Sequence, residues 1–347
     1  MSHVSLRDVA EQSGVSFQTV SKVLRGTGSV APATRQRILD AAAALGYVPN
    51  TLARGLATRS TRSIGFIASG LASFVLAPLL LGAEREAHAH GYFIVFALAT
   101  GHEDEADRLV RQLVERRVDG IVNAALTLQH DQRYGELLRT LTPSVGIFPV
   151  RGGGIPLVGE DPALTGYIAT RHLVNLGHRR IATILGDRDP RAPSGRLRGY
   201  RQALEEVGVE PDPNLAELGS WTGEGGYQAM QLLLDRAPDL TAVFSQNDHM
   251  AIGAISALHD RGLRVPEDVA IVGCDDIDLA RYTIPPLTTV RISFENDGAA
   301  AVRLLLDRIA NPETTPSRIV LPVELIKRSS CGHLATAKDG GRGSDSR

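Results

Sequence analysis

The sequence predicts an all-α headpiece at the N-terminus, followed by an α/β body of two doubly wound subdomains that are each built on a parallel sheet. Three observations predict this division. Two short amphipathic segments with capping residues lie between Val4 and Leu24. From Ser63 onward, apolar strands alternate with amphipathic helices, which is typical of parallel sheets covered on both faces. A chain of 347 residues is also too long for one compact core.

The stretch 4–24 predicts two short helices joined by a tight turn at Gly14. Ser5 can cap the first helix together with Asp8, and Ser16 can cap the second. Each helix has one apolar side, so the two helices can bury these sides against each other. The apolar residues are Leu6, Val9 and Ala10 in the first helix and Val20, Val23 and Leu24 in the second.

The outward side of the second helix carries side chains that suit a DNA major groove. They are Phe17, Gln18, Ser21, Lys22 and Arg25. An amide, a hydroxyl and cations near a helix start can contact base edges and phosphates. The alternative is a solvated face on an ordinary helical hairpin, but so small a hairpin has little other reason to expose a phenylalanine beside a glutamine and a lysine.

A third helix and a connector complete the N-terminal region. Pro32 begins a helix that should run to about Leu45. Residues 51–57 then predict a very short helix, which should become ordered only when something holds it, because two isolated turns are marginal in water. Leu52 and Leu56 lie on one face of it, so two such helices from two chains could pair over a minor groove with Leu56 as a wedge. The alternative is a linker whose leucines pack against the body.

Charge is distributed unevenly along the chain. Residues 1–62 carry eight Lys or Arg and three Asp or Glu, which gives this region a net charge of +5. The net charge of the whole chain is −2, so the remaining residues carry a net charge of −7. A basic head on an acidic body indicates a polyanionic partner for the head only.

Other compositional features favour a cytoplasmic protein. Cys274 and Cys331 are the only cysteines and lie in unrelated settings, so neither a disulfide framework nor a zinc ribbon is predicted. The N-terminus has no charged and then apolar signal sequence, and the most apolar run, 74–83, is too short to span a bilayer. We therefore expect a soluble, non-secreted protein without a metal, a cofactor or a membrane partner.

Nine or ten strands are expected in the body. The clearest lie at 64–68, 93–98, 120–124, 145–148, 181–185, 215–218, 242–244 and 270–272. The helices between them should end near His90, Arg116, Leu141, Leu176, Val207, Arg236 and Arg261. The residues after Cys331 are rich in Gly, Ser, Lys and Asp without a leucine repeat, so we expect a disordered tail and no coiled coil.

These residues resemble the lac repressor/gal repressor family of bacterial transcription regulators over nearly the whole chain. Three groups of motifs carry the resemblance. The first is the opening helix pair, and the second is 45–50 with Leu52, Ala53 and Leu56, which is similar to the hinge helix of the family. The third lies in the body: 176–181, 196–200, Asn247-Asp248, Asp275-Asp276 and 285–290.

The resemblance implies a dimer whose headpieces read a pseudo-palindromic operator. Phe17, Gln18 and Lys22 would contact base edges, with Leu56 as the minor-groove wedge. The expected phosphate contacts are Ser16, Thr19, Ser21 and Thr34. Ala31 departs from the family pattern, because a helix-capping hydroxyl is expected there.

The resemblance also implies a periplasmic-binding-protein-like body with a ligand cleft between its two subdomains. The expected division is a headpiece at 1–49, a hinge helix or linker at 50–61, a core at 62–331 and a tail at 332–347. Within the core, the N-subdomain would comprise about 62–161 and 293–321, and the C-subdomain about 162–290 and 323–331.

Candidate effector residues follow strand ends, where ligands bind in parallel sheets. They are Ser69, Phe148, Arg196, Trp221, Asn247 and Asp275. A carboxylate, an amide and a guanidinium that converge there suit a polyhydroxylated ligand, and Trp221 could stack on a sugar ring. Each residue also has a structural alternative: Asp275 could cap a helix, Asn247 could close a turn and Arg196 could be a surface cation.

Two departures from sugar-responsive members of the family bear on the effector. Phe148 stands where an aspartate is frequent, and Ala192 stands near a frequent hydroxyl. Both make the cleft more apolar, which favours a ligand with fewer hydroxyls or with a ring to stack over a simple hexose.

The expected function is repression of a carbohydrate-utilisation operon, with release from the operator when a sugar-like effector binds. A corepressor of the nucleobase or nucleoside type is the alternative. An enzyme is disfavoured because the glycine-rich nucleotide motifs and the serine nucleophile elbow are absent, although Asp248-His249 could suggest acid–base chemistry. A transport binding protein is disfavoured by the basic head and the lack of a signal sequence.

Overall fold

The computed structural model describes residues 4–24, 27–48, 60–70, 74–100, 105–186, 194–313 and 318–332. The chain divides into two compact units, Met1–Ser63 and Ile64–Arg347. The predicted hinge helix, with Asn50, Leu52 and Leu56, lies outside the described residues, as does the predicted tail beyond Gly332.

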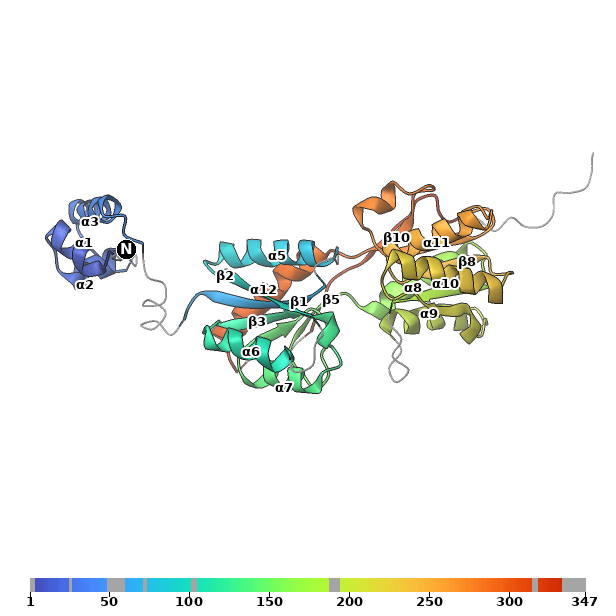
Figure 1. The fold of residues 1–347 in the computed structure, drawn as a ribbon, viewed down its shortest axis with the longest axis horizontal. Coiled ribbons are helices and arrows are strands. Elements are labelled where there is room, and N and C mark those ends of the chain that lie inside the picture. The colour runs from blue at the N-terminus through green and yellow to red at the C-terminus, as the bar shows by residue number, and fades with distance from the viewer. Residues whose placement is uncertain are drawn as a thin grey trace, which may run out of the picture. The chain divides into compact units, whose positions relative to one another are not determined.

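The headpiece is the predicted three-helix unit (Figure 1). Its helices are α1 (Leu6–Ser13), α2 (Phe17–Leu24) and α3 (Pro32–Ala44). They bury a small apolar core made of Val9, Val20, Val23, Ile38, Ala41 and Ala42. The predicted apolar faces are thus confirmed.

Local hydrogen bonds set the ends of these helices. The Asp8 carboxylate accepts from the Ser5 amide at 2.7 Å, and the Asp8 amide donates to the Ser5 hydroxyl at 3.4 Å, which forms the predicted capping box. Gly14 ends α1 with a φ of 64°, a conformation that glycine adopts without strain. Ala31 precedes α3 and offers no side-chain cap, as its residue type requires.

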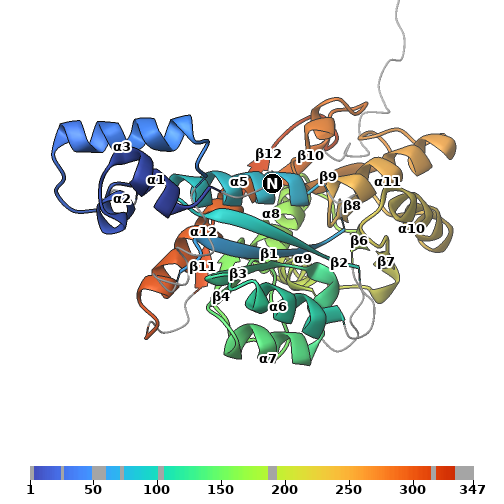
Figure 2. The same ribbon diagram turned by 60° about the vertical axis from the view of Figure 1, so that its left-hand side comes forward.

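The first sheet of the body contains six strands in the order β11-β5-β4-β3-β1-β2. Helices α5 and α12 lie on one of its faces, and α6 and α7 lie on the other (Figures 1 and 2). The strands are β1 (Ser63–Ser69), β2 (Phe93–Ala99), β3 (Gly120–Ala124), β4 (Ser144–Gly146), β5 (Leu157–Gly159) and β11 (Arg318–Val320). The helices are α5 (Leu76–Ala89), α6 (Glu105–Glu115), the short 3-10 helix η1 (Leu126–Leu128), α7 (Gln132–Thr140) and α12 (Phe294–Ala310).

The second sheet also contains six strands, in the order β12-β10-β9-β8-β6-β7. They are β6 (Ile181–Leu185), β7 (Ala216–Leu218), β8 (Ala242–Ser245), β9 (Ala270–Asp275), β10 (Thr288–Arg291) and β12 (Glu324–Ile326). The helices are α8 (Pro162–Asn175), α9 (Gly195–Glu205), the 3-10 helices η2 (Pro213–Leu215) and η3 (Asp278–Arg281), α10 (Gly223–Arg236) and α11 (Asp248–Asp260).

The predicted class of the body, two doubly wound sheets dominated by parallel pairing, is confirmed. Some details differ. The strand expected at 145–148 ends at Gly146, and the described residues form twelve strands rather than nine or ten. The unpredicted strands β5, β10, β11 and β12 are only three or four residues long, too short for an apolar pattern to stand out. Strand β12 pairs antiparallel with β10, at the edge of an otherwise parallel sheet.

Helix pairs in the body pack through glycines. A Cβ atom on Gly166 of α8 would lie 2.0 Å from the Arg196 carbonyl oxygen, and one on Gly199 of α9 would lie 1.9 Å from the Ala163 carbonyl oxygen. Both positions therefore require glycine, and the close contact of α8 with α9 fixes the position of Arg196. Among the described residues, no helix is both long and apolar enough to cross a bilayer.

Candidate functional site

The first candidate site is the outer face of α2. Phe17 is 49% exposed, and Gln18 and Lys22 are also exposed. An exposed phenylalanine next to an amide and a cation, at the beginning of a helix, is able to contact thymine methyl groups and base-edge acceptors. These three predicted base-contact residues therefore share one accessible surface.

The predicted phosphate contacts border this face. The Ser16 hydroxyl oxygen lies 3.2 Å from the Thr19 amide and caps α2, and it lies 2.8 Å from the Thr19 hydroxyl. Ser21 and Thr34 are half-buried. Ser16 is thus both a structural cap and an exposed hydroxyl near a helix N-terminus, where anions are favoured. Leu56, the fourth predicted base contact, lies outside the described residues.

The second candidate site is centred on Arg196 in the body. Its side chain is 11% exposed, and one guanidinium nitrogen lies 3.2 Å from a Glu160 carboxylate oxygen and 3.6 Å from an Asp275 carboxylate oxygen. The guanidinium also donates to the Gln246 carbonyl oxygen. Arg196 is therefore a buried, paired cation, so the surface-cation interpretation is wrong.

Burial and charge act in opposite directions on this guanidinium. Burial by itself lowers the pKa of Arg196, but Cys274, Asp275 and Glu160 raise it, and the net pKa lies above its ordinary value. Burial also raises the pKa of the Asp275 carboxyl well above its usual range, in spite of the neighbouring guanidinium. Arg196 stays charged, and Asp275 holds a proton far more readily than an exposed aspartate does.

Asp275 is held in an unusual backbone conformation at the end of β9. Its φ is 112°, and that of Asp276 is 58°, values that side-chain-bearing residues rarely adopt. The Asp276 carboxylate accepts from Arg291 at 2.8 Å and from Arg328 at 2.5 Å. Neither aspartate accepts a capping hydrogen bond from η3, whose preceding residue is Ile277, so the helix-cap alternative for Asp275 is wrong.

Asn247 combines a structural role with a place beside the tryptophan. Its side-chain oxygen accepts from the Met250 amide at 2.8 Å and caps α11. Its amide nitrogen donates to the Trp221 carbonyl oxygen at 3.1 Å. Asn247 therefore has a structural role as a helix cap, where turn closure was the expected alternative, and the same side chain fixes the backbone of Trp221.

The Trp221 ring lies over two features of the site. The Arg196 guanidinium carbon lies 5.7 Å from the ring centroid, within the range of a cation–π contact. A Cβ atom on Gly186 would lie 2.1 Å from the indole, so the ring packs directly on the backbone after β6. Four of the six predicted effector residues are thus brought together: Arg196, Trp221, Asn247 and Asp275.

Ser69 and Phe148 lie apart from this group. The Ser69 hydroxyl accepts from the Thr127 amide at 3.2 Å, and Phe148 packs against the apolar core of the first sheet. In the described parts of the chain, no hydrogen bond, ion pair or ring contact joins either residue to Arg196 or Trp221. Both residues lie at the carboxyl ends of strands of the first sheet, whereas the Arg196 group lies at the carboxyl ends of strands of the second.

Three residues of this region were not predicted. Glu160 directly follows the short strand β5 and pairs with Arg196. Gln246 is fully buried, and its side-chain nitrogen has no hydrogen-bond partner among the described residues. Phe74 lies 4.9 Å from the His249 ring and 5.9 Å from the Phe294 ring, measured between centroids. Glu160 and Gln246 directly follow strands, which was the available signal, but β5 itself was not predicted, and Phe74 shortly before α5 had no such signal.

The acid–base interpretation of Asp248-His249 has no support. Asp248 is buried, and its carboxylate accepts from the Thr289 hydroxyl at 2.6 Å and from the Ile277 amide at 2.9 Å. Burial raises the pKa of Asp248 to about 7, while the neighbouring His249 ring contacts Phe74. Asp248 thus joins α11 to the second sheet. Within the described residues, no group of three or more His, Cys, Asp and Glu could hold a metal ion.

Comparison with known proteins extends over both sites. Residues 5–50 match the family described as "Bacterial regulatory proteins, lacI family", and residues 170–331 match "Periplasmic binding protein-like domain". The HTH-type transcriptional regulator CelR of Thermobifida fusca is 40% identical over 340 residues, covering 94% of this chain and 98% of CelR.

Two solved structures are similar over almost the whole chain. A transcriptional regulator CelR–cellobiose complex is 37% identical in sequence, with a TM-score of 0.72. The match covers 94% of this chain and 100% of the CelR chain. A lac repressor dimer bound to operator and the anti-inducer ONPF is 31% identical in sequence, with a TM-score of 0.85. The match covers 96% of this chain and 100% of the lac repressor chain.

Proposed function

Since the chain belongs to the lacI family of bacterial regulatory proteins and is a DNA-binding transcriptional regulator rather than an enzyme, we propose that it represses a carbohydrate-utilisation operon. A sugar-like effector binds in the body and releases the protein from its operator. The protein acts in the cytoplasm as a homodimer.

The buried group around Arg196 carries this proposal. Different hydroxyls of one sugar can accept from the Arg196 guanidinium, donate to the Glu160 carboxylate and exchange a hydrogen bond with the Asp275 carboxyl, so one ligand satisfies all three side chains. Trp221 offers an aromatic face of the kind that stacks on the apolar side of a sugar ring. Two carboxyl groups beside one guanidinium disfavour an anionic ligand.

The similarity to the CelR–cellobiose complex makes cellobiose the first effector to test. We propose that Arg196, Trp221, Asn247 and Asp275 form the effector site together with Glu160, Gln246 and Phe74. Ser69 and Phe148 would meet the ligand from the other sheet when the cleft closes.

The headpiece reads the operator. Gln18 contacts a base through its amide, Lys22 donates to guanine acceptors and Phe17 contacts a thymine methyl group. Ser16, Thr19, Ser21 and Thr34 hold phosphates, and Leu56 of the predicted hinge helix inserts into the minor groove. Two headpieces, one from each chain of the dimer, match a pseudo-palindromic operator.

The body changes shape when the effector binds. We place the subdomain boundaries near residues 161, 291 and 322, because α8, α12 and β12 begin just beyond them and belong to alternating sheets. Closure around a sugar shifts the N-subdomains of the dimer, and the marginal hinge helices lose their register on the operator. A shift from mostly bound to mostly free requires about 5.5 kcal/mol of difference in effector affinity between the two states.

Fluorescence anisotropy of labelled DNA from the gene's own locus tests the proposal. We expect salt-sensitive, sequence-preferring binding that weakens when cellobiose is added. Strengthening on addition of a purine base or nucleoside would establish the corepressor alternative instead. Absence of sequence-preferring binding under both conditions would contradict the proposed function.

A further inference from the structure

The body contains a hollow of about 410 Å³ that belongs to neither candidate site. It is lined by the end of α7, the turn 141–143 that leads into β4, the loop before β5 and the end of α12. In the parallel register, Ser144 pairs with Ile121 and Gly120 pairs with Ile64, all at the starting ends of their strands. The hollow therefore lies at the end of the first sheet opposite to that from which Ser69 and Phe148 emerge.

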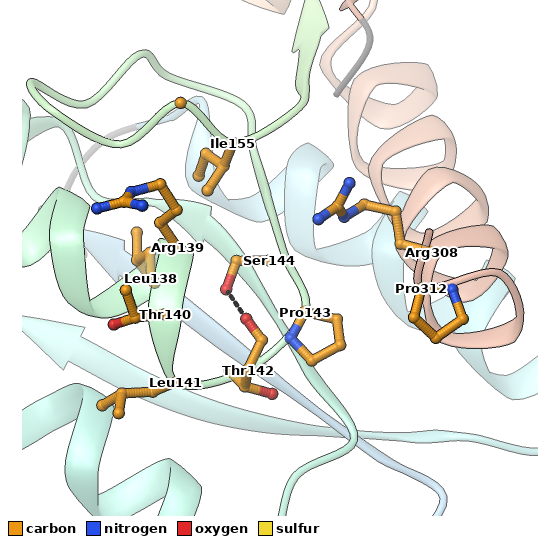
Figure 3. Close-up of a pocket in the computed structure, with 11 residues that line it drawn as sticks. Leu138, Arg139, Thr140, Leu141, Thr142, Pro143, Ser144, Ile155, Arg308 and Pro312 are labelled. Atoms are coloured by element: carbon orange, nitrogen blue, oxygen red, sulfur yellow. Dashed lines mark hydrogen bonds between the residues drawn. The ribbon is translucent and has the colours of Figure 1, made fainter. Parts of the chain in front are cut away.

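Two arginines give this hollow its charge. Arg139 and Arg308 lie on opposite sides of it, with Ser144 between them (Figure 3). None of the described residues that line it is acidic, and Arg139 has no ion-pair partner in the described part of the chain. Arg133, on the same helix as Arg139, instead pairs with Asp107 at 3.4 Å.

The hydroxyl groups in the hollow are largely occupied. Thr140 donates to the Glu136 carbonyl oxygen at 2.7 Å, and Ser144 donates to the Thr142 carbonyl oxygen at 3.1 Å. The two guanidinium groups would therefore neutralise a bound anion. They suit oxyanions because two N–H groups of one guanidinium can donate to two oxygens of the same anion. Leu141 and Ile155 add apolar walls.

We propose that this hollow is a binding site for a small phosphate ester, such as a sugar phosphate. A phosphate dianion matches two guanidinium groups, whereas a carboxylate carries only one charge. The volume lies within the range of known small-molecule sites. The site differs in charge from the group around Arg196, where carboxyl groups outnumber the cation.

The test uses the full chain and glucose 6-phosphate as the probe, measured by calorimetry without DNA, so its outcome is independent of the proposed operator function. We expect saturable binding that Arg139→Gln and Arg308→Gln each weaken at least tenfold. Arg139→Lys, which keeps the charge but loses the paired donors of the guanidinium, should weaken binding less than Arg139→Gln does. Arg133→Gln, on the same helix but outside the hollow, is the matched control and should bind normally.

Three results would overturn the proposal. The first is no saturable binding of glucose 6-phosphate to the folded protein. The second is binding that Trp221→Ala abolishes while Arg139→Gln and Arg308→Gln leave it intact, since the probe would then occupy the effector cleft. The third is loss of affinity for duplex DNA in the two arginine variants with no binding of the probe, because the hollow would then contact the DNA backbone.

Discussion

The headpiece and the effector region of the body use their functional residues in opposite ways. In the headpiece, Phe17, Gln18 and Lys22 are exposed on α2, while the fold is held by a separate apolar core. In the body, Arg196 is a buried ion-pair partner and Asn247 caps a helix. The comparison teaches that recognition and stability can be changed separately in the headpiece but are coupled in the body.

The largest effect should come from Arg196→Leu, which leaves the buried Asp275 and the partly buried Glu160 without their cation. Loss of one partner of a buried pair costs about 3–5 kcal/mol in the free energy of unfolding. Urea denaturation followed by the fluorescence of Trp221, the only tryptophan, reports on the body. Lys22→Leu is the matched headpiece variant and should leave this transition unchanged; a loss below about 1 kcal/mol for Arg196→Leu would break the comparison.

The two regions should also respond to pH with opposite signs. Burial raises the pKa of Asp248 and of Asp297 to about 7, so the folded body holds protons that the unfolded chain releases, and its stability falls as the pH rises from about 4 to about 7. One pKa unit corresponds to about 1.4 kcal/mol, so the loss is on the order of a few kcal/mol. In the headpiece, hydrogen bonds from Ser5 lower the pKa of Asp8, so its stability is lost as the pH falls below about 4.

Unfolding midpoints between pH 3 and pH 8 check this contrast, with tryptophan fluorescence for the body and circular dichroism for the headpiece helices. Asp297→Asn removes one of the titrating groups and should flatten the decrease in body stability. A body that becomes more stable between pH 4 and pH 7 would contradict the assignment.

Gln18→Ala combined with Lys22→Ala should separate recognition from stability. Each base contact contributes about 1–3 kcal/mol of discrimination, so operator affinity and sequence preference should both fall clearly. The unfolding midpoint should stay within about 0.5 kcal/mol of the wild type because both side chains are exposed. If operator preference is unchanged in the anisotropy assay, α2 is not the helix that reads the bases.

Asn247 allows the two roles of one buried residue to be separated. Asn247→Ala removes the α11 cap and the bond to Trp221, and should cost about 1 kcal/mol of stability as well as effector affinity. Asn247→Asp keeps a capping oxygen but loses the donor to Trp221. It should therefore retain most of the stability while it binds effector more weakly, as read by tryptophan fluorescence; equal stability loss in both variants would refute the separation.

The smallest effect should come from Ala31→Ser, which restores the missing cap of α3. A capping hydroxyl is worth about 0.5–2 kcal/mol, and Ala31 has an extended ψ of 138° that a serine can adopt. Thermal unfolding followed by circular dichroism should show a more stable headpiece with an unchanged body. A less stable headpiece would mean that the Ala31 backbone does not permit the cap.

Local interactions explain why the headpiece could be predicted from the sequence. The capping box of Ser5 and Asp8 and the turn at Gly14 each depend on residues within four positions of each other. Burial of Val9, Val20 and Ile38 follows from helical periodicity.

The body could be predicted only in part, because its effector region depends on distant segments. The ends of long apolar strands identified Asn247 and Asp275. Glu160 could not be found, since it follows a three-residue strand and meets Arg196 only through the tertiary fold. Ser69 and Phe148 belong to the first sheet and the Arg196 group to the second, so whether a ligand joins them depends on how the two sheets face each other, which strand patterns alone do not give.

Operator binding with and without cellobiose tests the central claim most directly. Fluorescence anisotropy on DNA from the gene's own locus should show tight, salt-sensitive binding that cellobiose weakens in the wild type but not in Trp221→Ala. An operator complex that cellobiose strengthens, or that it weakens equally in Trp221→Ala, would contradict the account.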